Sequence, residues 1–181
     1  MAPTGNLTVR RWPAYAIAGG VGLFCLVVVS VAAFEQLVQG KPANGDAVVA
    51  LGATGLRVMT IVVALVAVSR WERRVPARIL SMALWAMAIG QLAYPLAETL
   101  VKAAILLDLI EPLNKGISNM SATGWFNFAA AWLVWGVPGV LFGLLASDHR
   151  RRHALSWLWA PLGGLGGMAA LAVLGLVISR L

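Results

Sequence analysis

The chain is dominated by apolar segments that are each long enough to cross a lipid bilayer. The hydrocarbon core is about 30 Å thick and a helix rises about 1.5 Å per residue, so one crossing needs about 20 apolar residues. Five stretches reach this length, at about 14–38, 47–69, 79–107, 125–146 and 156–179. We therefore predict an all-α integral membrane protein, with residues 1–181 forming one transmembrane domain of five helices and no soluble domain. Four helices are the alternative, if the last segment lies partly against a partner.

Basic residues alternate with these segments. The 181 residues include 14 Lys and Arg against 7 Asp and Glu, a balance that in a soluble chain would suggest nucleic-acid binding. Nine of the 14 instead form three clusters, which precede the first, third and fifth segments: Arg10, Arg11; Arg70, Arg73, Arg74, Arg78; and Arg150, Arg151, Arg152. By the positive-inside rule these clusters are cytoplasmic, which predicts a cytoplasmic amino terminus and an outer carboxyl terminus. We expect the arginines between segments to contact anionic headgroups, and we expect no nucleic acid partner.

Ionisable residues inside the apolar segments need a specific reason, because a charge at the bilayer centre costs about 2.5–3.5 kcal/mol on insertion scales. Arg57 lies near the middle of the second segment. Residues at helical spacing on the third segment share one face: Gln91, Tyr94, Pro95, Glu98 and Lys102. One interpretation is a polar pocket for a ligand in the outer half of the bundle, formed by Glu35, Arg57, Gln91, Glu98 and Lys102. The other is a set of structural ion pairs, or an arginine that meets an acid on another subunit.

Two indoles and several glycines mark the last two segments. Trp132 and Trp135 lie well inside the fourth, where they could border a flat lipid-soluble cofactor such as a quinone, or a bound lipid, or could pack against a neighbouring helix. Small-residue spacing predicts close helix packing at two pairs of positions, Gly139 with Gly143 and Gly163 with Gly167.

Residues for independent catalysis are not identifiable. Cys25 is the only cysteine, and no nucleophile motif is present. His149 and His153 can share a helix face, as metal ligands do, but three arginines separate them, so we interpret them as part of a basic loop and expect no metal. We therefore expect a protein that is not an enzyme and needs no resident cofactor.

Three functional hypotheses follow. The first is a non-catalytic integral subunit that assembles with other membrane subunits, or with copies of itself. The second is a transporter or channel component with the polar pocket as its solute site. The third is a component that binds a lipid-soluble cofactor. The excess of Arg over Lys and the Ala, Gly, Val and Leu content favour a multi-pass protein of a bacterial inner membrane.

Overall fold

Every element in the described part of the chain is a helix. The computed structural model describes the backbone of residues 11–38, 40, 45–113 and 115–178. The order is α1 (Trp12–Leu37), α2 (Gly45–Val66), η1 (Arg70–Arg74), α3 (Ala77–Leu106), η2 (Gly116–Ser118), α4 (Ala122–Ala131), η3 (Trp132–Gly136), α5 (Val137–Arg152) and α6 (Trp159–Ile178). Each of the five predicted apolar segments is therefore helical. Residues 1–10, with Arg10 of the first basic cluster, and residues 179–181 lie outside the described part.

The number of helices that could cross a membrane is smaller than predicted. Three are long and apolar enough over the described residues: α1, α3, and the continuous run Ala122–Arg152, which joins α4, η3 and α5. A further apolar helix, Gly52–Val66, is shorter. The structure thus establishes an all-helical fold with three such helices, and the predicted count of five is not established.

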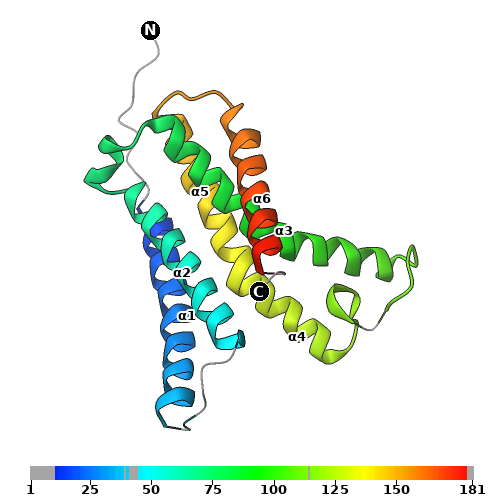
Figure 1. Ribbon diagram of the computed structural model, residues 1–181. Coiled ribbons are helices and arrows are strands. Elements are labelled where there is room, and N and C mark those ends of the chain that lie inside the picture. Colours follow the sequence, from blue (N-terminus) through cyan, green and yellow to red (C-terminus); the bar gives the residue numbers. More distant parts are fainter. Residues whose placement is uncertain (1–10, 39, 41–44, 114, 179–181) are drawn as a thin grey trace.

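The helices form a bundle with an arm that leaves it sideways (Figure 1). Helices α1 and α2 form an antiparallel hairpin, α1 also packs on α5, and α3 packs mainly on α6 and α5. Helix α3 changes direction partway along, and its second half runs out of the bundle and returns through η2 and α4. We call residues 96–131 the lateral arm. Pro95 lies inside α3 and lacks an N–H, so it removes one helical hydrogen bond where α3 bends.

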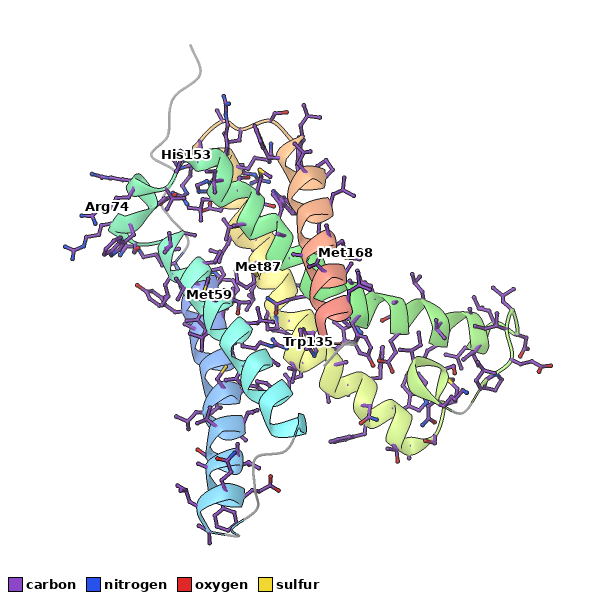
Figure 2. The ribbon with its side chains drawn as sticks, viewed as in Figure 1. Met59, Arg74, Met87, Trp135, His153 and Met168 are labelled. Atoms are coloured by element: carbon purple, nitrogen blue, oxygen red, sulfur yellow. The ribbon has the colours of Figure 1, made fainter. Side chains whose placement is uncertain are left out.

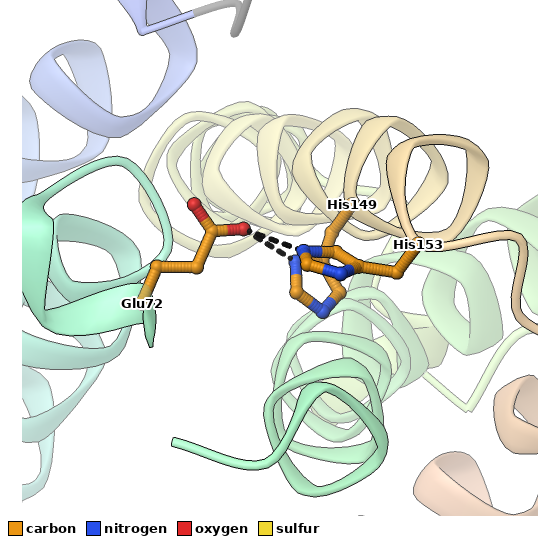
Figure 3. Close-up of side chains that lie close together, drawn as sticks. All are labelled: Glu72, His149 and His153. Atoms are coloured by element: carbon orange, nitrogen blue, oxygen red, sulfur yellow. Dashed lines mark hydrogen bonds and ion pairs between the residues drawn. The ribbon is translucent and has the colours of Figure 1, made fainter. Parts of the chain in front are cut away.

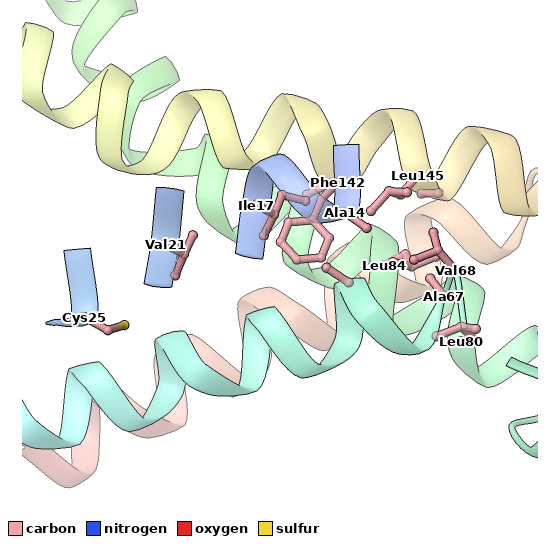
Figure 4. Packing of buried hydrophobic residues seen from close by; sticks show 13 residues of the cluster. Ala14, Ile17, Val21, Cys25, Ala67, Val68, Leu80, Leu84, Phe142 and Leu145 are labelled. Atoms are coloured by element: carbon pink, nitrogen blue, oxygen red, sulfur yellow. The ribbon is translucent and has the colours of Figure 1, made fainter. Parts of the chain in front are cut away.

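The apolar core is formed by α1, the end of α2 with the residues that follow it, α3 and α5 (Figure 4). Ala14, Ile17 and Val21 recur every three or four residues and bury one stripe of α1, which packs on α2 and α5; Leu84 and Phe142 of the same cluster are fully buried. The rest of α1 is apolar and exposed, with Leu23 and Leu26 each 65% accessible. A helix that is apolar all round but buried along only one stripe is suited to a lipid environment.

Glycines set the close approach of α6 and α5 to α3. A Cβ added at Gly163 would lie 2.5 Å from the Met82 carbonyl oxygen, and one at Gly167 would lie 2.9 Å from that of Ala86. A Cβ added at Gly139 would lie 2.7 Å from Leu92 Cγ, whereas one at Gly143 would meet nothing within 4 Å. Three of the four glycines singled out in the sequence therefore face α3, and Gly143 faces open space.

Candidate functional site

Arg57 is buried where α1, α2, α3 and η3 meet. Its side chain is 5% exposed. The guanidinium stacks on the Trp135 ring, with 3.6 Å between Cζ and the ring centroid, and the Phe24 ring lies 5.5 Å away. Arg57 Nη1 donates to the Val134 carbonyl oxygen at 2.9 Å and to Gln91 Oε1 at 3.5 Å. Arg57 and Gln91 thus come together as their positions in the sequence suggested, while the contacts from Val134 and Phe24 were not anticipated.

The Val134 carbonyl is available because of local backbone chemistry. In a regular helix this oxygen would accept from the N–H of residue 138, but Pro138 has none. The preceding turn is also widened into a π-helix, in which the Val137 N–H donates to the Trp132 oxygen. Arg57 therefore supplies the hydrogen bond that Pro138 cannot, and the sequence of the fourth apolar segment creates the acceptor that the second segment uses.

The site has more hydrogen-bond donors than acceptors. Arg57 Nη2 and Gln91 Nε2 are both buried without a partner. Over the described residues, Arg57 makes no ion pair with a carboxylate. Trp135 and Phe24, the two rings against the guanidinium, are 41% and 38% exposed. The chemistry of the site therefore fits an anionic or carbonyl oxygen that reaches the donors past these two rings.

Glu98 and Lys102 form a second buried polar centre at the base of the lateral arm. Each side chain is 2% exposed, and Lys102 Nζ lies 3.6 Å from Glu98 Oε1. Lys102 Nζ also donates to the Asn119 carbonyl oxygen at 2.5 Å and lies 5.0 Å from the Trp125 ring centroid. This ammonium therefore joins α3 to the chain that returns through η2 and α4.

The remaining predicted residues occupy different places in the fold. Glu35 is exposed near the end of α1, eleven residues beyond Phe24, which is about 16 Å along a helix. Trp132 Nε1 donates to Thr99 Oγ1 at 3.0 Å, so this indole ties η3 to α3, while Trp135 stacks on Arg57. The structure therefore divides the predicted five-residue pocket into an Arg57–Gln91 site, a Glu98–Lys102 pair and a separate Glu35.

The basic segments gather at one end of the bundle, where Arg74 and His153 are labelled (Figure 2). Most of the arginines predicted to meet headgroups are exposed: Arg70, Arg73, Arg74, Arg78 and Arg151. Arg150 instead stacks on Trp157, with 3.8 Å between Cζ and the ring centroid. Arg152 is directed inward, and its Nη1 donates to Glu72 Oε1 at 2.8 Å while its Nε donates to Asp148 at 3.2 Å.

Glu72 organises this end and was missed in the sequence. His149 Nδ1 and His153 Nε2 lie 3.0 and 3.1 Å from its Oε1 (Figure 3). Burial raises the pKa of Glu72, but the hydrogen bond from His153 and the charge and hydrogen bond of Arg152 oppose this, and the pKa lies below its ordinary value. Glu72 is therefore a carboxylate at neutral pH. Its position as the one acid between Arg70 and Arg78 is the signal that could have identified it.

No protein-family model, curated protein or solved structure matches this chain.

Proposed function

We propose that this protein is a non-catalytic integral subunit of a larger membrane-protein assembly. It would sit in a bacterial inner membrane as a bundle of five transmembrane helices, with the amino terminus in the cytoplasm and the carboxyl terminus outside. The orientation is supported by the arginines of η1, α3 and α5, which gather at one end of the bundle (Figure 2).

The observation that carries this proposal is the donor excess around Arg57. A cation inside the hydrocarbon costs about 2.5–3.5 kcal/mol, and residues of this kind normally pair with one another or line a functional path. Arg57 has one good acceptor, the Val134 carbonyl, and its Nη2 has none. A carboxylate on a helix of a partner subunit would accept a hydrogen bond from Arg57 Nη2 and neutralise the guanidinium. It would also accept a hydrogen bond from Gln91 Nε2.

The accessible side of this site suits a protein partner within the membrane. Trp135 and Phe24 are both partly exposed and stand against the guanidinium. Beyond them the lateral arm exposes further large apolar side chains, including Leu100 at 70% and Phe126 at 73%. Aromatic and arginine side chains are the residues that contribute most at protein interfaces, so a helix packed here would find both contact area and a charge partner.

Purification in a mild detergent followed by native mass spectrometry tests this proposal. We expect the wild-type chain to retain a stoichiometric membrane partner. We expect Arg57→Met, which keeps an unbranched flexible stem and removes the charged guanidinium, to lose the partner at least tenfold while the chain itself still accumulates. Arg151→Met is the matched control, because Arg151 is exposed, and it should keep the partner. A wild-type chain that runs as a stable, ligand-free monomer would refute the proposal.

A second candidate function is the binding of a lipid-soluble carbonyl compound, such as a quinone. The specific observation in its favour is that two unfilled donors, Arg57 Nη2 and Gln91 Nε2, adjoin an exposed indole, Trp135. A quinone ring would stack on the indole and accept hydrogen bonds through its carbonyl oxygens. Organic extraction of the purified chain distinguishes the two functions, because a stoichiometric quinone that disappears in Arg57→Met would favour this one.

A further inference from the structure

We propose that Glu72, His149 and His153 form a binding site for one divalent transition-metal ion, for which Zn²⁺ has the best-matched chemistry. The three ligand atoms would be Glu72 Oε1, His149 Nδ1 and His153 Nε2, which all lie within 4.8 Å of one another. Figure 3 shows the carboxylate of η1 and the two imidazoles of the end of α5 converging on one point.

Two of the three separations among these atoms are a few tenths of an ångström shorter than those of a tetrahedral site. Zinc bonds to nitrogen and oxygen are about 2.0–2.2 Å long, so two ligand atoms at a tetrahedral angle stand about 3.3–3.6 Å apart. The carboxylate oxygen lies 3.0 Å from His149 Nδ1 and 3.1 Å from His153 Nε2. Shifts of a few tenths of an ångström would admit the ion. The set of two imidazoles and one carboxylate also combines ligands that zinc accepts.

The hydrogen-bond partners of His149 favour a cation between its Nδ1 and Glu72 Oε1. His149 Nε2 lies 3.0 Å from the Ala77 carbonyl oxygen, which can only accept, so the ring proton belongs on Nε2. In a neutral ring, Nδ1 then presents a lone pair to Glu72 Oε1 at 3.0 Å. Two facing acceptors repel unless a proton or a metal ion lies between them. His149 is fully buried, and a metal ion satisfies its lone pair without an imidazolium.

The surroundings have the features of an outer shell. A metal-bound histidine commonly donates its second ring N–H to a backbone carbonyl, as His149 does to Ala77. Arg152 also contacts Glu72 Oε1, but it shares its charge with Asp148, so two carboxylates and one guanidinium surround the site. His153 is 38% exposed, which leaves the fourth coordination position open to solvent. The ion would clamp η1 to the end of α5, two segments separated by 77 residues.

The test uses the full-length chain in detergent, purified without a histidine tag and treated with a chelator. We expect about one Zn²⁺ per chain after equilibration and desalting, measured by elemental mass spectrometry. We expect bound Co²⁺ to give the strong visible absorption of a tetrahedral site. Mg²⁺ needs octahedral oxygen ligands, so we expect it not to displace the bound Co²⁺. His153→Ala should weaken binding of Zn²⁺ at least tenfold, because it removes one of three ligands. Arg151→Ala, an exposed neighbour, should leave the affinity unchanged.

Three results would overturn the proposal. The first is a wild-type chain that takes up no stoichiometric Zn²⁺, which would leave a proton shared between His149 and Glu72 as the explanation. The second is equal affinity in the wild type and His153→Ala. The third is octahedral Co²⁺ absorption in the wild-type chain, which decides the question even if His153→Ala fails to accumulate. None of these results bears on Arg57, so the site can fail while the proposed subunit function stands.

Discussion

Adding a single methyl group at Gly163 should loosen the packing of α6 on α3. The new Cβ would lie 2.5 Å from the Met82 carbonyl oxygen and 3.0 Å from both Met82 Cα and Trp85 Cβ. Carbon and oxygen atoms in close contact normally stand about 3.3 Å apart, so α6 would have to retreat by about 0.8 Å. The nearest obstacle is backbone and cannot rotate away. Overpacking of this kind costs about 1–3 kcal/mol.

Gly166 provides a matched control on the same helix. A Cβ there meets nothing within 4 Å, so Gly166→Ala adds only the better helix propensity of alanine, about 0.5–1 kcal/mol in favour of the folded state. The same propensity gain accompanies Gly163→Ala. The difference in unfolding free energy between the two variants therefore isolates the steric cost, about 1–3 kcal/mol, or about 5- to 150-fold in the unfolding equilibrium.

The measurement is reversible unfolding of each purified variant by titration of a denaturing detergent into mild-detergent micelles, followed by circular dichroism. We expect Gly166→Ala to unfold at a slightly higher denaturant fraction than the wild type and Gly163→Ala at a lower one. If the two variants unfold at the same midpoint, α6 does not pack on α3 through this glycine face and the reasoning fails.

Two further predictions concern the lateral arm. Lys102→Met would leave Glu98, which is 2% exposed, as a buried carboxylate without its ion-pair partner, so we expect about 3–5 kcal/mol of destabilisation. Adding Glu98→Gln to the same chain removes the charge and should largely reverse this loss. The same unfolding titration measures both variants. Trp132→Phe removes the donor, and Thr99→Val the acceptor, of the 3.0 Å hydrogen bond from Trp132 Nε1 to Thr99 Oγ1. A double-mutant cycle should give a coupling energy of about 0.6 kcal/mol between the two positions. Additive effects of the two mutations would show that this bond contributes nothing to stability.

Much of the fold follows from patterns that are local in the sequence. Hydropathy located all five helical segments within a few residues, because the length of an apolar run is a property of neighbouring residues. The helical stripe from Gln91 to Lys102 lies on a face that is buried only in part: Gln91, Pro95, Glu98 and Lys102 are buried, whereas Tyr94 is 50% exposed. Glycine spacing likewise indicated where helices approach closely, at Gly163 and Gly167.

The site depended on relations that the sequence does not display. The acceptor of Arg57 is a backbone carbonyl, and it is free because Pro138, which has no N–H, follows four residues later. The lateral arm could not be derived from the presence of Pro95, since the angle of a proline kink depends on what packs on either side of it. Glu72 was hidden for a related reason, because its histidine partners lie 77 and 81 residues away.

The bond between Arg57 and Val134 also has a consequence for the biosynthesis of this chain. The arginine emerges from the ribosome 77 residues before the carbonyl that accepts from it. At about 5–20 residues per second, about 4–15 s pass between the two. In the proposed five-helix arrangement, α2 would carry a cation during that interval with neither its carbonyl nor its indole, and its stable residence in the hydrocarbon would depend on the later arrival of η3. In that arrangement the fourth apolar segment would act as an intramolecular insertion partner for the second.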